Sequence, residues 1–539
     1  MFKFHDPVDV GNPVLDHATE PVASSLCPSS TREDRTAGQA EFSDRETMAN
    51  IIPPPCTRLS LLLKKTFNDT YSEYCYTWGP ILEVQDIMQN PLFSNSLLLE
   101  QALGVLGTRI KPPLVPCSSA NTYFETTKQL FYGNYERNPL VRIMAIMLLY
   151  WWSGGDPESA GIEALFWWNT VAIRLAQQLG FHREPAKDHD SLQFGDIGLR
   201  RRIWWTLYAR ERLTFICTTK PCMIHPDDCN VPRPCVEDFP PNQVHRAVIF
   251  IRWVAISDIM ERVGKYMFYQ MDKDPPFPVS LQKELVSWAQ DLPEELQLPF
   301  SNRTHNAAST SFDRDVLQLH MHYLMATTLV HMSGSGQQHL RKAGTVAILA
   351  ASCTARICEE FLASGSLGFL PGATGRYISV ALLSLLYARK IDMLSEAANE
   401  QIEILFLALK EMAKRWRSSE KLVLSLEKIV QGGQEQDPHD DSYQLGPSAN
   451  GHAEQLPGML PATPSAMSGH SPNEGSISDI DFFPSATSET TPLFKLLLGQ
   501  SPRANGFPHD YSEWPDINIQ LNGLFDQIFD DNYSNWPNL

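Results

Sequence analysis

Residues 199–217 read LRRRIWWTLYARERLTFIC, and they set the expectation for the whole fold. One side of this stretch repeats at intervals of three or four residues: Leu199, Ile203, Leu207 and Arg210. A strand would instead alternate apolar and polar residues, whereas this spacing is that of one helix face. Three large aromatic residues lie beside the repeat, at Trp204, Tyr208 and Phe215. The stretch therefore predicts a helix that packs aromatic side chains into a core.

The residues before this stretch repeat the same pattern. An apolar stripe runs from about Glu163 to Leu179, and Gly180 follows it as a helix stop. Further helices are predicted over residues 97–107, 138–152, 247–269, 279–291, 312–331, 340–364, 377–396 and 400–431. No clean alternating strand pattern and no short hairpin turn between β-branched runs is found. The fold class predicted for the body of the chain is all-α.

Composition divides the chain into three parts. Residues 1–58 are rich in Ser, Thr, Pro and acidic residues and show no period, which predicts a disordered leader. Residues 59–430 carry the helical periodicity and are predicted to be one large helical regulatory domain. Residues 431–539 shift to Gly, Gln, Ser, Pro and acidic residues, which predicts a disordered tail.

The acidity of the chain is concentrated in the tail. The whole chain has a formal net charge of −18, of which residues 431–539 carry −13, so the other 430 residues carry −5. Islands of Phe and Leu interrupt the acidic tail at 480–484, 493–498 and 521–529. Such interleaving is typical of activation segments that offer aromatic side chains to a partner groove. A negative net charge repels the phosphate backbone, so direct DNA binding is doubtful.

Other bulk features exclude two protein classes. The longest apolar run, residues 143–152, is too short to span a bilayer. The first ten residues include charged side chains and cannot form a secretory signal, and the ten Cys are scattered. We expect a protein of the cell interior with reduced thiols and no membrane segment.

Three motifs resemble a known family. They are AIRLAQQLGFHRE at 172–184, RRRIWWTLYARER at 200–212, and KPCMI followed by DDCNVP within 220–232. In this order they are similar to the fungal-specific transcription factor domain, the middle homology region of fungal zinc-cluster regulators. The likeness extends over residues 59–430 and is nearest to the cutinase-regulator and secondary-metabolism branch. It implies a helical regulatory domain, a nuclear location and a role in transcription.

The chain departs from that family at its beginning. Members of the family start with six closely spaced cysteines that hold two zinc ions and place a helix in the major groove. Here only Cys27 and Cys56 precede the body. The zinc-cluster DNA reader is absent from this sequence. Either the regulator is shortened, or the start of the gene model is set too far downstream.

No catalytic, cofactor-binding or metal-binding residue is proposed from the sequence. The nearest candidate for a metal site is a set of four cysteines, but its gaps of four, six and five residues lack the two close pairs of a structural zinc site: Cys217, Cys222, Cys229 and Cys235. His320 and His322 point to different faces of a helix and His331 lies nearly three turns further on, so the three histidines are expected to be independent. The basic run 200–202 could contact phosphate, but pairing with carboxylates is the favoured interpretation. No phosphate loop, nucleophile elbow or HExxH pattern occurs.

Three functions fit these observations. The first is a transcription regulator of a biosynthetic gene cluster or another metabolic gene set. It would use the transcription machinery and a full-length zinc-cluster regulator as partners, in a homodimer or heterodimer. The second is an interaction protein that dimerises with full-length relatives and inhibits them. The third is a helical domain that senses a metabolite in a cavity between helices.

Overall fold

The computed structural model describes eight stretches of the chain: residues 58–152, 165–185, 196–218, 220–269, 278–298, 312–334, 341–432 and 477–498. The predicted leader, apart from its last residue, lies outside these ranges, and so do residues 433–476 and 499–539 of the predicted tail.

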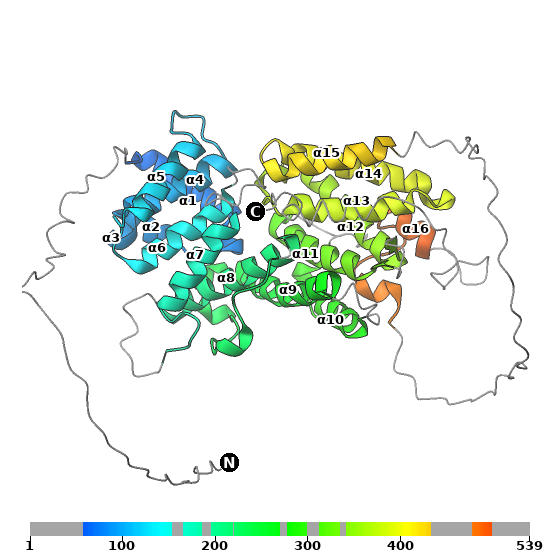
Figure 1. Ribbon diagram of the computed structural model, residues 1–539, viewed down its shortest axis with the longest axis horizontal. Helices are drawn as coiled ribbons and strands as arrows, with labels where there is room; N and C mark the ends of the chain where they lie inside the picture. The colour runs from blue at the N-terminus through cyan, green and yellow to red at the C-terminus, as the bar shows by residue number, and fades with distance from the viewer. Residues whose placement is uncertain are drawn as a thin grey trace, which may run out of the picture. The chain divides into compact units, whose positions relative to one another are not determined.

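The described residues form sixteen α-helices, several 3-10 turns and one short strand pair (Figure 1). The elements up to the middle of the chain are α1 (Leu61–Tyr74), η1 (Tyr76–Trp78), α2 (Val84–Gln89), α3 (Pro91–Ser94), α4 (Leu97–Ile110), α5 (Ala120–Tyr132), α6 (Pro139–Leu148), η2 (Leu149–Trp151), α7 (Leu165–Gln178), α8 (Ile197–Thr218), η4 (Pro226–Asp228), η5 (Val236–Asp238), η6 (Pro241–Gln243) and α9 (Val244–Tyr269). The later elements are α10 (Val279–Gln290), η8 (Glu294–Leu296), α11 (Arg314–Val330), β1 (Met332–Gly334), β2 (Arg341–Ala343), α12 (Thr345–Ala363), η9 (Leu367–Phe369), α13 (Thr374–Ala388), α14 (Asp392–Ala413), α15 (Arg417–Gly432), η10 (Asp479–Phe482) and α16 (Pro492–Leu498).

Short polar residues begin several of the helices. The hydroxyl groups of Ser60, Ser96 and Ser119 each accept the backbone N–H three residues later, at the starts of α1, α4 and α5. The side-chain oxygen of Asn90 accepts the N–H of Leu92, that of Asn138 accepts the N–H groups of Leu140 and Val141, and each Asn is followed by a proline in the first turn of α3 or α6. These caps satisfy N–H groups that have no partner within the helix. The local sequence therefore determines where these helices begin.

The helices share one buried core. In the earlier part of the described chain α4 packs against α1, α5 and α6, and in the later part α11 to α15 pack mainly on their neighbours in sequence. Helix α8 packs against α7 and α9, and its side chains are buried almost all the way round. The all-α prediction is confirmed, with one three-residue antiparallel ribbon in which Met332 lies opposite Ala343. No helix in the described ranges is long and apolar enough to cross a membrane.

The helices predicted over 340–364, 377–396 and 400–431 have different boundaries in the structure. The helix predicted over 340–364 begins later, at Thr345, because residues 341–343 pair with β1. The helices predicted over 377–396 and 400–431 are three helices, with breaks between Ala388 and Asp392 and between Ala413 and Arg417. The second break lies at Trp416, whose indole is buried and donates to the carbonyl of Leu370. A tertiary contact, which periodicity does not reveal, therefore accompanies this turn of the chain.

A part of the predicted tail belongs to the folded body. Residues 477–498 form η10 and α16, which contact α10, α12 and α14 (Figure 1). The prediction of a disordered tail over 431–539 is therefore wrong for this segment. Its apolar side chains at Phe482, Phe483, Leu493 and Phe494 are buried. Their burial offsets the entropy lost on ordering, which the surrounding polar composition alone would not do.

Candidate functional site

Helix α8 brings a set of charged side chains into the core of the described residues. The helix is buried almost all the way round, so its five basic residues are buried or half-buried: Arg200, Arg201, Arg202, Arg210 and Arg212. A guanidinium group in a core needs acceptors for its five N–H donors. The acceptors come from segments far away in the sequence.

Arg200 and Arg201 hold the turn that follows α7. The Arg200 guanidinium lies 4.6 Å from the centre of the Phe181 ring and donates to the carbonyl of Gly180. Arg201 forms ion pairs with Glu184 and with Asp238, the latter at 2.9 Å. Hydrogen bonds to Glu184 raise the pKa of Arg201 above its ordinary value. The two arginines therefore join the turn after α7 to α8 and, through Asp238, to η5.

Arg202 connects α8 to two other segments. Its Nε donates to the carbonyl oxygen of Pro80 at 2.8 Å, and Nη1 donates to the carbonyl oxygen of Asp238. Its Nη2 lies 3.4 Å from Glu83. Two of these acceptors are backbone carbonyls, so the contact depends on the positions of both loops and not on their side chains.

Arg210 is buried two turns further along the same helix. It donates to the carbonyls of Met147 and Trp78, at 2.8 and 3.2 Å, and its guanidinium lies 4.2 Å from the centre of the Tyr150 ring. Removal from water lowers the pKa of Arg210 to about 10. The group remains protonated at neutral pH, with two carbonyls as its hydrogen-bond partners.

The end of the motif holds the loop that follows α8. Glu211 accepts the backbone N–H groups of Met223 and Ile224. Arg212 donates to Glu261 on α9 at 3.0 Å and to the carbonyl of Ile224 at 2.8 Å. The second and third sequence motifs are therefore in direct contact through buried polar groups.

These contacts answer the question about residues 200–202. The carboxylate pairing expected from the sequence is present for Arg201 and Arg202, whereas Arg200 uses a carbonyl and an aromatic ring. The roles of Arg210 and Arg212 were not anticipated. The available signal was an arginine recurring within an otherwise aromatic, apolar helix, which requires buried acceptors.

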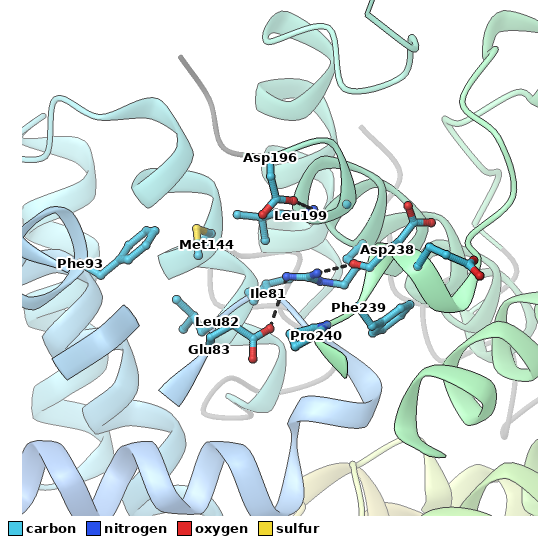
Figure 2. A pocket seen from close by; sticks show the side chains of 13 residues that line it. Ile81, Leu82, Glu83, Phe93, Met144, Asp196, Leu199, Asp238, Phe239 and Pro240 are labelled. Carbon is cyan, nitrogen blue, oxygen red and sulfur yellow. Dashed lines mark hydrogen bonds and ion pairs between the residues drawn. The ribbon is translucent and has the colours of Figure 1, made fainter. Parts of the chain in front are cut away.

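A pocket opens beside the start of α8 (Figure 2). Its volume is about 410 Å³. Apolar side chains form one part of the lining, namely Ile81, Leu82, Phe93, Met144, Leu199 and Phe239. The charged part of the lining is Arg202 together with Glu83, Asp196, Glu237 and Asp238. The Arg202 guanidinium contacts both Glu83 and the backbone carbonyl of Asp238, so it forms part of the pocket wall.

The four cysteines of the candidate zinc site lie at the end of α8 and in the loop that follows it. Cys217 is buried near the end of α8, and the other three are half-buried in the loop that follows: Cys222, Cys229 and Cys235. Burial raises the pKa of all four thiols, to about 11 for Cys217 and about 12 for Cys222. Within the described ranges, no group of three or more His, Cys, Asp or Glu side chains is placed to hold a metal ion.

The three histidines are separate core residues. The His320 ring bonds to the carbonyl of Leu296, and the His322 ring bonds to the carbonyl of Gln318. His331 bonds to the carbonyl of Thr327. Burial lowers the pKa of each histidine to about 4. The structure therefore places them in the core as neutral rings, each with its own backbone acceptor.

Comparison with known proteins finds the same resemblance as the three motifs. The family model described as the fungal specific transcription factor domain matches residues 69–252, which include all three motifs. Cutinase transcription factor 1 alpha of Fusarium vanettenii is 23% identical over 405 residues, which are 67% of this chain and 42% of that protein. Cutinase transcription factor 1 beta of the same organism is 31% identical over 197 residues, 33% of this chain and 21% of that protein.

A third relative comes from another genus. The acetamidase regulatory protein of Aspergillus fumigatus is 27% identical over 166 residues, 30% of this chain and 21% of that protein. The chain spans less than half the length of each of these three relatives. No solved structure matches. Residues 69–252 match the fungal specific transcription factor domain, which confirms the resemblance carried by the three motifs.

Proposed function

We propose that this chain regulates transcription in the nucleus, with the helical body as its regulatory part and residues 431–539 as its activation region. One observation supports the proposal: residues 69–252 match the domain, and within them α8, the helix of the second motif, is buried in the core. The names of the relatives, which are transcription factors and a regulatory protein, support the same function. The gene set that we propose is metabolic, either a biosynthetic cluster or a programme that degrades plant polymers.

A separate element brings the chain to DNA in this proposal. The arginines of α8 are engaged with carbonyls, carboxylates and rings of the same chain, so they offer no free phosphate-binding face. The net charge of −18 also opposes binding to a polyanion. Pairing with a full-length zinc-cluster regulator supplies the contact to DNA.

A tethering experiment tests the function. The full chain is fused to a foreign DNA-binding domain and its effect on a reporter gene is measured, with the DNA-binding domain alone as the control. Output above the control is expected, and deletion of residues 431–539 should remove it. A silent reporter, together with an unchanged transcriptome after deletion of the gene, would reject the proposal. If the chain instead lowers the output of a full-length relative, and still does so without residues 431–539, it is an inhibitor.

A second function, metabolite sensing, is favoured by the pocket beside α8. Its apolar wall and its excess of carboxylates over the single guanidinium suit an apolar molecule that carries a cationic group. Binding would raise the melting temperature of the purified full chain. Leu199→Trp narrows the pocket without removing an arginine contact, and it should abolish that shift. A ligand-induced shift that persists in this variant would place the ligand elsewhere.

A further inference from the structure

Residues 477–498 have the composition of a partner-binding segment. Asp479, Asp481 and Glu489 alternate along this stretch with aromatic and aliphatic residues. Segments of this kind bind partners by laying their apolar side chains into a groove while the carboxylates remain near solvent. Here the same apolar side chains are buried against the body of the chain itself.

Phe482 occupies the centre of the contact. Its ring meets the His331 ring edge to face, with 4.9 Å between the ring centres. Its carbonyl oxygen accepts a hydrogen bond of 2.9 Å from the buried hydroxyl of Tyr323. The Tyr323 ring in turn stacks on Trp288 of α10 at 5.1 Å. Two helices of the body, α10 and α11, therefore form the surface that receives Phe482.

The other end of the segment is held by α12 and α14. The Thr491 and Ser352 hydroxyls share a buried hydrogen bond of 2.6 Å. The Thr491 hydroxyl also accepts the backbone N–H of Phe494, in the first turn of α16. Phe494 packs edge to face on Phe483 at 5.3 Å. The segment therefore packs both on itself and on the body.

Few hydrogen bonds join the segment to the body within the described residues. The Asp481 carboxylate accepts the backbone N–H of Ser478, within the segment, and Glu489 is exposed. Besides the bonds of Tyr323 and Ser352, Ser485 makes a bond of 3.3 Å to Gln297. A cavity of about 20 Å³ remains between residues 482–486 of the segment and the side chains of the body that face them. The contact is therefore mostly apolar, and its packing is incomplete.

We propose that residues 477–498 are a partner-binding part of the activation region, and that the groove of α10, α11, α12 and α14 competes with an external protein for its apolar face. The partner is a protein with an apolar groove and a basic rim, which matches the aromatic face and the three carboxylates. In the docked form the segment is masked. The inference rests on the proposed function, because it assumes that the tail activates transcription.

The covalent connection to the body explains how a mostly apolar contact can hold yet yield to competition. Residues 433–476 tether the segment to α15, so docking is intramolecular and occurs at a high effective concentration. A partner that binds only the released form shifts the population by its affinity for that form. Weakening the groove without altering the segment should then increase access for the partner.

The test uses two conservative changes in the groove of the full chain. Tyr323→Phe removes the hydroxyl that binds the Phe482 carbonyl, and Ser352→Ala removes the hydroxyl that binds Thr491. Both changes leave the sequence of the segment intact. The matched control is Tyr76→Phe, which removes a tyrosine hydroxyl that donates to Glu83 at 2.8 Å instead.

Hydrogen exchange of the purified full chain measures release. Loss of two buried hydrogen bonds should make opening more frequent by roughly tenfold or more, and exchange of the amides in residues 477–498 should accelerate accordingly. In the double variant, the amides elsewhere in the body should exchange as in the parent chain. In the Tyr76→Phe control, the amides of residues 477–498 should also exchange as in the parent chain. If the double variant leaves exchange in 477–498 as slow as in the parent, the segment is a permanent part of the body and the proposal is overturned.

The tethered reporter measures the consequence. The double groove variant should exceed the parent chain several-fold, whereas Phe482→Ala combined with Phe494→Ala should fall below it because the partner loses its anchors. If release is seen by exchange but the groove variant activates no more than the parent, masking is refuted and the activation function stands. If the parent, the groove variant and the DNA-binding domain alone give equal output, the activation function itself has failed.

Discussion

The Nε of Arg202 donates to the carbonyl oxygen of Pro80 over 2.8 Å, across 122 positions of sequence. Nη1 of the same guanidinium donates to the carbonyl of Asp238, so one side chain ties α8 to loops on both sides of it in the sequence. The planar fork of arginine can serve both carbonyls at once, which the single ammonium group of lysine cannot do in the same geometry. Arg202 of the second motif therefore has a structural role, because it holds two loops against α8.

Arg202→Lys should destabilise the chain even though the charge is retained. The change leaves at least one buried carbonyl without a donor and places a strongly hydrated ammonium group in the core. We expect the free energy of unfolding to fall by about 3 kcal/mol, the lower part of the range for breaking a buried ion pair. Urea unfolding followed by tryptophan fluorescence measures the difference.

The matched control for Arg202 is an exposed arginine. Arg262 pairs with Glu284 on the surface, where both side chains are more than a third exposed. Arg262→Lys should change the free energy of unfolding by less than about 1 kcal/mol because solvent screens the pair. Equal losses in the two variants would show that the carbonyl contacts of Arg202 do not stabilise the fold.

Gly107→Ala should destabilise the chain although alanine is the better helix former. A Cβ atom at Gly107 would overlap the ring of Phe67 on α1, which packs against α4. Overpacking of this kind costs about 1–3 kcal/mol, which exceeds the gain of about 1 kcal/mol in helix propensity. Thermal unfolding of the variant measures the net effect.

A second variant separates overlap from other causes at Gly107. Phe67→Leu makes room at the same site, so the combination of Phe67→Leu with Gly107→Ala should lose less stability than the two single losses added together. Strict additivity would mean that the Phe67 ring is not what excludes a side chain at Gly107.

Local signals explain the part of this fold that could be predicted. The apolar spacing of 199–217 and the Gly180 stop are properties of neighbouring residues, and α7 and α8 are where they predict. The break near Trp416 and the acceptors of Arg202 depend on Leu370, Pro80 and other distant carbonyls. The docking of 477–498 depends on a groove built by four other helices. Periodicity and composition carry no information about such pairs, so the sequence indicated the motif but not its partners.

Alkylation should distinguish one cysteine of the described residues from the rest. Cys117 is exposed, whereas Cys75, Cys353 and Cys358 are buried and their thiol pKa values are raised by burial. The thiolate is the reactive form, so both access and ionisation disfavour the buried groups. At pH 7.5, Cys117 should react with iodoacetamide at least tenfold faster than these three buried cysteines, as measured by peptide mass spectrometry. Comparable rates for Cys117 and Cys353 under native conditions would mean that α12 opens readily.

The three buried histidines should make the fold less stable in mild acid. Burial lowers the pKa of His320, His322 and His331 to about 4, below the ordinary value of 6.5. The unfolded chain then binds more protons than the folded chain between these values, so stability is fully present above about pH 6.5 and is lost as the pH falls towards 4. Each histidine contributes a slope of up to about 1.4 kcal/mol per pH unit. Urea unfolding at several pH values between 7 and 5 measures the total.

One substitution assigns part of that slope to a single ring. His322 stacks on Trp78 with 5.5 Å between ring centres, and His322→Phe keeps an aromatic ring there while removing the titrating group. The variant should lose about a third of the pH dependence between pH 6.5 and 5, since three similar groups share it. If His322→Phe has the same slope as the parent chain, the His322 ring binds its proton equally in the folded and unfolded states, and the burial argument does not apply to it.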